Sequence, residues 1–367
     1  MIVSHFLQRR QSGVSILEID TVSFDEATRE LVIIDQTLLP GRLERMRLND
    51  AASIREAIRR LCVRGAPAIG VAAALGLYAC AVRIAPEADF AAEFARCAEQ
   101  IETARPTAVN LSWAVKRMRK AACASQPLEA LRAEAFAIRD EDIRVCQSIG
   151  ENGLALVRDG DGILTHCNAG QLATVRYGTA LAPIHVGARR GMYFRVYTDE
   201  TRPLLQGARL SAYEMVEVGM ETTVLCDNMA ASLMQSGAVQ AVFVGCDRVA
   251  ANGDACNKIG TSGVAILAKY YGIPFYVLGP TSTIDMSIEK GEDIHIEQRP
   301  AEEVTEMWYK KRMAPEGVKV YNPAFDFADN ELIAGIVTEY GIARPPYTES
   351  LKEIFKKKAE AEAAKKK

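Results

Sequence analysis

The second half of the chain repeats one pattern: a short apolar run, a polar cluster and a helical stretch, at spacings of roughly thirty residues. The apolar runs are 162–166, 193–197, 222–225, 241–245 and 275–278. Strands that alternate with helices predict βαβ units and a parallel sheet. Because crossovers between parallel strands are right-handed, every polar cluster should lie at the same edge of that sheet. The second half therefore predicts a parallel α/β domain with a ligand site at this edge.

The first half of the chain is organised differently. Short alternating runs predict the strands of a small antiparallel sheet, at 15–19, 31–34 and 42–48. Alanine-rich helical patterns follow, over 67–82, 88–103, 107–124 and 127–156. A stretch rich in Gly and Asp at 158–162 marks the change, so we expect two domains, 1–157 and 158–367.

The stretch 241–263, AVFVGCDRVAANGDACNKIGTSG, carries the densest polar cluster. Cys246, Asp247 and Arg248 fall where the apolar run ends, and a helix is predicted from about Lys258. A thiol, a carboxylate, an amide and an ammonium group at a strand's carboxyl edge suit a small anionic ligand. In the alternative interpretation, Asp247 is only a turn residue and Cys246 fills the core.

Other strand ends carry similar polar groups. His166, Cys167 and Asn168 close the first apolar run of the second half, and a helical stretch is predicted from Gly170 to Leu181. Side chains alternate along a strand, so His166 should face away from Cys167, and we assign it a packing role. Helices are also predicted over 204–216 and 229–235.

Two arginines of the first half stand beside predicted helix starts. Arg64 precedes the Pro67 helix, and Arg105 is followed directly by a proline. Guanidinium forks match phosphate oxygens, and a helix N-terminus favours anions, so the pair predicts a phosphate clamp. Lys258 could add a third positive charge. In the alternative interpretation, both arginines cap helix ends or pair with surface acids.

Composition and missing motifs exclude several classes of function. The net charge of −3 gives no case for nucleic-acid binding, and no apolar run is long enough to cross a membrane. The nine cysteines are scattered through predicted helices and strand ends, as in reduced proteins, and no secretory signal is evident, so we expect a cytoplasmic protein. Dinucleotide, P-loop and zinc motifs are missing, which predicts a site without metal or cofactor.

Several motifs together resemble a known family. They are RGAPAIG at 64–70, RPTAVNLSWAV at 105–115, THCNAG at 165–170, YGTAL at 177–181, DETRPLLQGARL at 199–210, CDNMAASLM at 226–234 and GCDRVAANGDACNKIGT at 245–261. The chain resembles the methylthioribose-1-phosphate isomerases, relatives of the regulatory subunits of a translation-initiation guanine-exchange factor. The resemblance implies a small N-terminal sheet with a helical domain, a Rossmann-like C-terminal domain and a homodimer. It also implies an aldose–ketose isomerase of methionine salvage that acts on a phosphorylated sugar without a cofactor.

The resemblance also implies roles for individual residues. Asp247 would be the general acid and Cys167 its catalytic partner. The substrate would be held by Arg64, Gly65, Ala66, Arg105, Gln206, Asn257 and Lys258. Protonating the ring oxygen needs a neutral carboxylic acid, so we expect Asp247 to be buried beside Val242–Val244, which would raise its pKa.

Gln171, Val175 and Arg176 depart from the small residues expected after the CNAG motif. They leave 5-deoxyribose 1-phosphate open as an alternative substrate. A ribose-1,5-bisphosphate isomerase would need a second cationic cluster, for which Arg176 and Arg202 are candidates. A non-catalytic, ligand-sensing regulatory subunit is the remaining alternative, although it would need neither Cys167 nor Asp247.

Overall fold

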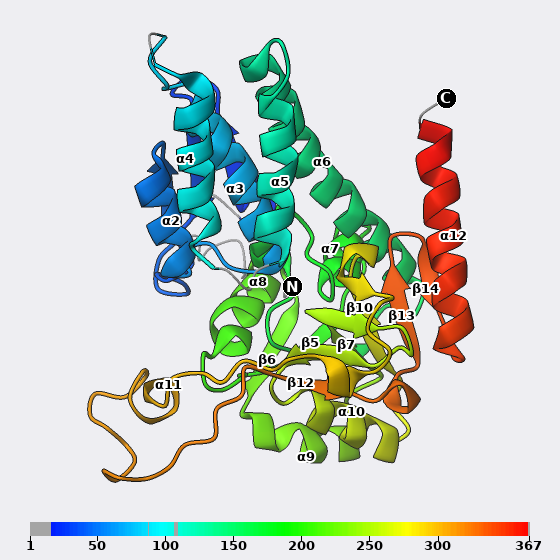
Figure 1. The fold of residues 1–367 in the computed structure, drawn as a ribbon. Helices are drawn as coiled ribbons and strands as arrows, with labels where there is room; N and C mark the ends of the chain where they lie inside the picture. The colour runs from blue at the N-terminus through cyan, green and yellow to red at the C-terminus, as the bar shows by residue number, and fades with distance from the viewer. Residues whose placement is uncertain (1–15, 87, 106–108, 366–367) are drawn as a thin grey trace. The chain divides into compact units, whose positions relative to one another are not determined.

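The computed structural model describes residues 16–86, 88–105 and 109–365, shown in Figure 1. The chain divides into two compact units. The first holds residues 1–147 and 169–178, and the second holds 148–168 and 179–367. The domain boundary that we expect at 157/158 stays a prediction. None of the helices in the described ranges is long and apolar enough to span a membrane.

The first unit contains a three-stranded antiparallel sheet in the order β1 (Val22–Asp25), β2 (Glu30–Ile34) and β3 (Arg45–Leu48). The last two strands confirm the sequence pattern. The strand predicted at 15–19 is wrong for its described part, because Ile16–Glu18 forms a 3₁₀ turn. The Gln171 side-chain amide donates to the carbonyl oxygens of Ile16 and Ile19, at 2.7 and 2.9 Å. These acceptors are thereby used by a side chain instead of a neighbouring strand.

The helices of the first unit pack around α3 (Ala66–Ala81), which is apolar on every side and almost wholly buried. It contacts three other helices, which Figure 1 shows beside it: α2 (Ala51–Arg59), α4 (Phe90–Glu102) and α5 (Val109–Ala122). Aspartates cap two of these helices: Asp50 accepts from the Ser53 N–H at 2.9 Å, and Asp89 starts α4 in the same way. The long helix α6 (Pro127–Leu154) follows.

Residues 169–178 belong to the first unit although they follow the first strand of the second. The helix predicted over 170–181 is wrong: only Gln171–Ala173 makes a 3₁₀ turn, and α7 begins later, at Ala182–Arg189. Gln36 Nε2 donates to the Leu172 carbonyl at 2.7 Å, and Asp142 accepts from the Val175 N–H at 2.7 Å. These tertiary hydrogen bonds hold the segment in an irregular path despite its helix-like sequence.

The second unit is built on a seven-stranded sheet in the order β14-β13-β10-β7-β4-β5-β6. All neighbours are parallel except the β13–β14 pair. The strands are β4 (Gly162–His166), β5 (Arg195–Asp199), β6 (Glu221–Leu225), β7 (Ala241–Val244), β10 (Phe275–Leu278), β13 (Gly335–Thr338) and β14 (Gly341–Ala343). The predicted parallel α/β fold is confirmed.

Helices and turns lie between these strands, and one helix, α12, follows the last of them. They are the π-helical turn Gly207–Ser211, α8 (Ala212–Glu217), the 3₁₀ turn Asp227–Met229, α9 (Ala230–Gln235), α10 (Thr261–Tyr270), α11 (Glu302–Thr305) and α12 (Tyr347–Lys365). Val264 and Ala268 of α10 and Leu351 of α12 are buried in the same apolar core as Val242 and Val277 of the sheet. This core fixes the parallel strands, and thereby the edge at which they end.

A second sheet, in the order β11-β8-β9-β12, follows the end of β7. Its strands are β8 (Arg248–Ala250), β9 (Ala255–Lys258), β11 (Ile284–Asp285) and β12 (Phe325–Ala328). The helix predicted from about Lys258 is therefore wrong in its start: Lys258 ends β9, and α10 begins at Thr261. Gly260, at φ +103°, makes the turn between them, and Asp326 accepts from its N–H at 2.9 Å.

Asp254, in the β8–β9 turn, ties this small sheet to two other segments. Its carboxylate accepts from the N–H groups of Gly291 and Asn330, at 2.9 and 2.8 Å, and from the side chains of Asn252 and Asn330, both at 2.8 Å. Burial alone would raise the pKa of Asp254, but these hydrogen bonds together hold it below its usual value. The ionised carboxylate is therefore part of the folded structure.

We expect Asp254→Asn to lower the free energy of unfolding at pH 7 by about 3 kcal/mol, because an amide cannot accept all four hydrogen bonds. A folded-state pKa below the unfolded value gives stability that is complete above the unfolded pKa and is lost as the pH falls through the folded pKa. Urea unfolding between pH 7 and pH 2 should therefore show a smaller acid-induced loss in the variant. Asp293→Asn, at an exposed neighbouring turn, is the control. Equal stability of both variants would contradict this role.

Candidate functional site

The site begins where the strand order of the large sheet reverses. From β4 the chain adds β5 and β6 on one side, and it then adds β7, β10 and β13 on the other. His166 at the end of β4 lies opposite Val244 at the end of β7. Cys167 directly follows one strand, and Asp247 leaves the other three residues later. In open α/β sheets such a switch point is where ligands bind.

Cys167 is held in an unusual backbone conformation. Its φ of +69° lies in the left-handed region, which side chains rarely adopt, and the side chain is half-buried. The Cys167 N–H donates to Thr201 Oγ1 at 2.8 Å, and Ser211 Oγ donates to the Cys167 carbonyl oxygen at 2.7 Å. Thr201, itself at φ +63°, donates its N–H to Asp227 at 2.7 Å. Strain retained by such hydrogen bonds is typical of functional residues.

Asp247 is exposed, so the burial that we expected beside Val242–Val244 is wrong. The chain leaves the large sheet after Val244, and Asp247 lies between that sheet and β8. Its N–H donates to the Cys256 carbonyl oxygen at 2.8 Å. Asp247 is therefore an exposed residue at the strand-end edge and is not part of the core.

Cys246 takes the inward position beside Asp247. Its Sγ lies 3.2 Å from Thr283 Oγ1, and a Cβ added to Gly279 would come within 2.3 Å of the sulfur. Burial raises the pKa of the Cys246 thiol to about 12, although its hydrogen bond with Thr283 acts in the opposite direction. Cys246 is therefore protonated at neutral pH and packs between strands, as expected for a core residue.

Gln206 and Asn257 are polar side chains buried near the same strand ends, 7% and 5% exposed. Among the described residues Gln206 Oε1 has no hydrogen-bond partner. An unsatisfied buried acceptor is costly, so it favours a bound donor from outside the chain. Asn257 Nδ2 donates to Thr261 Oγ1 at 3.1 Å, which links β9 to the start of α10.

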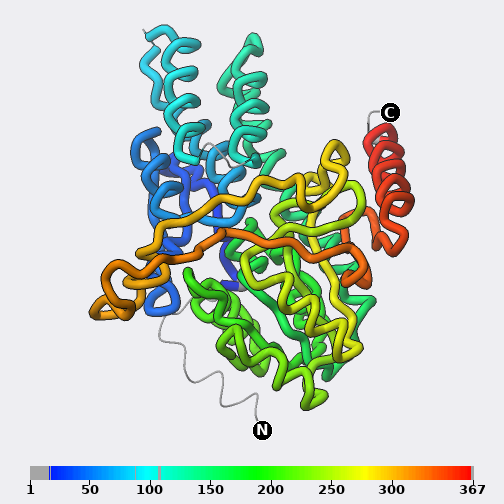
Figure 2. Tube along the Cα trace, turned by 60° about the horizontal axis from the view of Figure 1, so that its bottom comes forward, coloured from blue at the N-terminus to red at the C-terminus, as the bar shows by residue number. Residues whose placement is uncertain are grey.

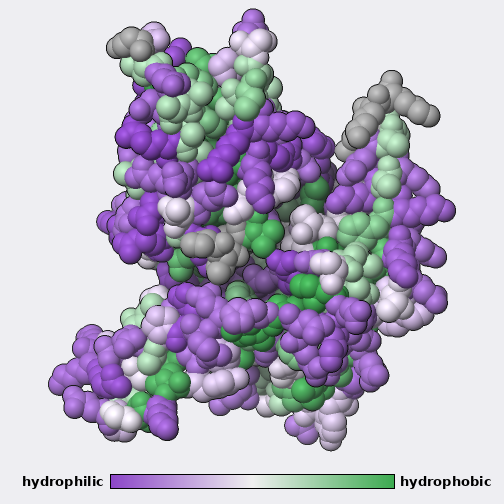
Figure 3. Space-filling model, viewed as in Figure 1, coloured by the Kyte–Doolittle hydropathy of each residue, from purple (hydrophilic) through white to green (hydrophobic). Residues whose placement is uncertain are grey.

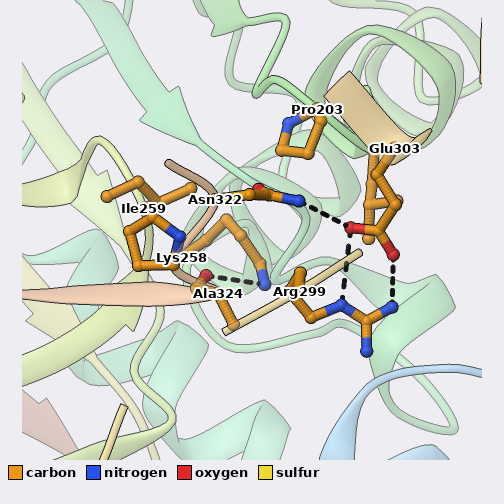
Figure 4. Close-up of a pocket in the computed structure, with 9 residues that line it drawn as sticks. Pro203, Lys258, Ile259, Arg299, Glu303, Asn322 and Ala324 are labelled. Atoms are coloured by element: carbon orange, nitrogen blue, oxygen red, sulfur yellow. Dashed lines mark hydrogen bonds and ion pairs between the residues drawn. The ribbon is translucent and has the colours of Figure 1, made fainter. Parts of the chain in front are cut away.

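Lys258 lies in a small pocket, drawn in Figure 4. Its Nζ donates to the Ala324 carbonyl oxygen at 2.9 Å and lies 4.2 Å from the centroid of the Phe325 ring. The arginine in this pocket, Arg299, is paired with Glu303, which also accepts from Asn322 Nδ2 at 3.3 Å. Lys258 is thus oriented by a carbonyl oxygen and a ring, while Glu303 is occupied by other groups.

The loop between α11 and β12 is anchored on the segment that carries Gln206. The indole N–H of Trp308 donates to the Pro203 carbonyl oxygen at 2.7 Å, and the Arg209 guanidinium carbon lies 4.8 Å from the indole centroid. Figure 2 follows this loop out from the second unit, and Figure 3 shows apolar surface on it. Its anchoring fixes one side of the pocket around Lys258.

The first unit carries the other predicted binding residues. Arg64 and Gly65 precede α3, Ala66 begins it, and Arg105 follows α4. Gly65 has φ +88°, and a Cβ there would lie 2.5 Å from Ala173 Cα. The group that approaches Gly65 closely in the structure is therefore the backbone of Ala173. The proline-started helix predicted from 107 begins outside the described residues. That these residues join those of the second unit around one substrate stays a prediction.

Sequence reasoning missed several residues that support the site. Thr201 and Asp227 lie in polar clusters at the predicted strand ends. However, no sequence pattern indicates that Thr201 binds the Cys167 backbone or that Asp227 binds Thr201. Ser211 and Asp326 lie outside those clusters, far along the chain from the groups that they bind. Only a three-dimensional arrangement identifies them.

One described cluster has the composition of a metal site: His166, Asp199 and Asp227 each place a ligand atom within 4.8 Å of the others. However, both His166 ring nitrogens already have protein partners, Asp199 Oδ2 at 3.0 Å and the Ile259 carbonyl oxygen at 2.8 Å. The two oxygens of Asp227 accept from the N–H groups of Thr201 and Arg202, both at 2.7 Å. The arrangement is that of a hydrogen-bonded network, and the metal-free site stays a prediction.

The Initiation factor 2 subunit family matches residues 62–345. A Symbiobacterium thermophilum protein named methylthioribose-1-phosphate isomerase is 61% identical over 94% of this chain and 98% of its own. A Clostridium botulinum 5-deoxyribose 1-phosphate isomerase is 49% identical over 93% of this chain and 99% of its own. The crystal structure of 5-methylthioribose 1-phosphate isomerase from Pyrococcus horikoshii superposes with a TM-score of 0.87, at 42% identity over 92% of this chain and 96% of that one.

Proposed function

The chain belongs to the Initiation factor 2 subunit family, among its methylthioribose-1-phosphate isomerases, and we propose that it converts S-methyl-5-thioribose 1-phosphate to the corresponding ribulose 1-phosphate. The observation that carries this proposal is the switch point. The strained Cys167 follows β4, and Asp247 follows the neighbouring β7. This pair gives an aldose–ketose isomerase a thiol and a carboxyl group at one sheet edge. The reaction fits methionine salvage.

The chemistry needs an acid and a base. A sugar whose anomeric oxygen carries phosphate cannot open by losing a hydroxyl proton, so protonation of the ring oxygen must assist opening. Asp247 is the general acid for this step. Cys167 then takes part in moving hydrogen from C2 to C1, as the base if its thiolate is formed. Because Asp247 is exposed, we propose that bound substrate, rather than the protein core, shields its carboxyl group from water during this step.

Substrate binding is assigned to groups from both units. Arg64 and Arg105 hold the phosphate, with the Gly65 and Ala66 backbone beside them. Lys258 adds a third cation, and Gln206 and Asn257 bind sugar hydroxyls. The unpartnered Oε1 of buried Gln206 supports this assignment, because a hydroxyl would satisfy it.

A second candidate is 5-deoxyribose 1-phosphate, which the names of relatives at about half identity support. The three residues that raised this alternative all interact within the first unit. Gln171 donates to the Ile16 and Ile19 carbonyl oxygens. Val175 is buried, and Arg176 forms an ion pair with Asp20. The bisphosphate alternative would need Arg176 and Arg202 as its second cationic cluster. Arg176 is paired with Asp20, whereas Arg202 donates to the Val304 carbonyl oxygen at 2.8 Å and keeps its charge.

Turnover by purified protein tests the proposal. We expect S-methyl-5-thioribose 1-phosphate to give the highest kcat/KM, 5-deoxyribose 1-phosphate to follow, and ribose 1,5-bisphosphate to be poor. The 5-substituent is remote from C1 and C2, so it should alter binding more than chemistry. No turnover of any of the three would favour the non-catalytic regulatory subunit instead.

We expect Asp247→Asn to lower kcat about a hundredfold or more, because the amide keeps the shape but delivers no proton. Cys167→Ser should lose most activity as well, since a hydroxyl is a far weaker acid than a thiol. Cys246→Ser is the matched control: its half-buried thiol packs against Thr283 and Gly279, which predicts a lower melting temperature with kcat nearly unchanged. Folded Asp247→Asn and Cys167→Ser proteins with parental kcat would exclude the assigned pair.

We infer that the protein is a homodimer. The strand at one edge of the large sheet, β6, is mostly exposed, and apolar side chains lie on and beside it: Val216, Val224 and Met229, 46%, 47% and 50% exposed. An apolar edge of this kind is usually covered.

Light scattering should give the mass of two chains for the parent and of one chain for Val224→Arg. Ile266→Arg, at an exposed position on α10, is the control and should stay dimeric. A monomeric parent would refute the dimer, and a dimeric Val224→Arg would exclude this surface.

We also assign the enzyme to the cytoplasm. All nine cysteines are free thiols, which suits a reducing compartment. Fractionation of the producing cells checks this assignment, and recovery outside the cytoplasmic fraction would contradict it.

A further inference from the structure

His166 is a buried histidine that joins three parts of the second unit. It ends β4 directly before Cys167 and is 1% exposed. Nδ1 lies 3.0 Å from Oδ2 of Asp199, the last residue of β5, and Nε2 lies 2.8 Å from the Ile259 carbonyl oxygen. Ile259 directly follows Lys258. One imidazole ring therefore links two strand ends to the loop that follows Asn257 and Lys258.

The partners of the ring fix its protons. A carbonyl oxygen only accepts, so Nε2 must carry a hydrogen and donate it to Ile259. Nδ1 faces a carboxylate, and two facing acceptors would repel each other, so a second proton lies between Nδ1 and Oδ2. Burial would lower the pKa of His166, but Asp199, with a smaller contribution from Asp227, raises it above the usual value. Burial also raises the pKa of Asp199, with small contributions from Asp227 and Glu200, against the effect of His166.

The loop fits closely around the ring. Gly260 has φ +103°, and a Cβ added there would lie 2.8 Å from His166 Cε1. Thr261 Oγ1 donates back to the Lys258 carbonyl oxygen at 2.7 Å. On its other side the turn is held by the segment around β12: the Ile259 N–H donates to the Ala324 carbonyl oxygen at 3.1 Å, and Asp326 accepts from the Gly260 N–H at 2.9 Å. Among the described residues His166 alone binds the carbonyl oxygen of Ile259, so loss of the Nε2 contact would loosen that side of the turn, next to Asn257 and Lys258.

We propose that His166, oriented by Asp199, is a positioning residue that holds the Lys258–Thr261 turn so that Asn257 and Lys258 meet the substrate. The packing role expected from the sequence is therefore too limited, since the ring acts through directed hydrogen bonds. The proposal rests on the proposed function for its effect on turnover. Its effect on the loop does not depend on any substrate.

Two matched pairs of variants test this positioning role. His166→Gln places an amide N–H near the position of Nε2 and can still donate to Ile259, whereas His166→Asn reaches only the position of Nδ1. We expect His166→Asn to raise KM about tenfold with a smaller change in kcat, and His166→Gln to stay within about threefold of the parent. Likewise Asp199→Ala should raise KM, and Asp199→Asn should restore it, because its amide can donate to Nδ1 of a ring protonated on Nε2.

Hydrogen–deuterium exchange of residues 255–261 in the ligand-free protein is the second measurement. Exchange should be faster in His166→Asn than in His166→Gln. Tyr347→Phe is the control, because it also removes a buried side-chain donor to a main-chain carbonyl, that of Ile333 at 2.7 Å. It should lower stability without changing KM or this exchange. Equal exchange in the two His166 variants would overturn the positioning role. A parent that turns over none of the sugar phosphates would instead refute the proposed function, while the exchange result would still decide the role of His166.

Discussion

The pairing of β4 with β7 is the contact on which the rest of the site depends. These strands are neighbours in the sheet but lie about eighty residues apart in the chain. Cys167 directly follows the first, and Asp247 leaves the second three residues after its end. Every other group in the second unit's site is positioned relative to this pair: Thr201 and Ser211 fix the thiol's backbone, and the small sheet beyond β7 carries Asn257 and Lys258.

The sequence predicted the elements best where one physical signal dominated. The sequence predicts β4 and β10 with their observed bounds because both are short, fully buried strands flanked by Gly, Asp or Pro turn residues. The helix predicted over 170–181 is wrong because hydrogen bonds with Gln36 and Asp142 hold this segment in an irregular path. Both residues are distant in the chain, so no local sequence pattern reveals these bonds. The sequence predicts Lys258 at the start of a helix because the short strand β9 and the turn at Gly260 resemble a loop that leads directly into that helix.

The site was partly visible for a related reason. Polar residues that end an apolar run mark the ends of parallel strands, so the pattern places Cys167 and Asp247 in strand-end clusters, while the resemblance to a family singles them out within those clusters. The exposure and backbone conformation of these two residues could not be predicted in this way. The exposure of Asp247 depends on where the chain turns into a second sheet, and the φ of Cys167 depends on Thr201 and Ser211, 34 and 44 residues away. The spacing of apolar runs predicts which polar residues lie at the strand ends. Tertiary hydrogen bonds decide how those residues are oriented.

The ten residues 169–178 have an evolutionary consequence. They belong to the first unit but are inserted between Asn168 and Thr179 of the second, two residues after Cys167. No single recombination breakpoint can exchange one unit for a homologous copy without leaving either this decapeptide or residues 148–168 with the wrong parent. Chimaeras within the lineage should therefore be rare, and the two units are expected to have diverged together as one inherited block.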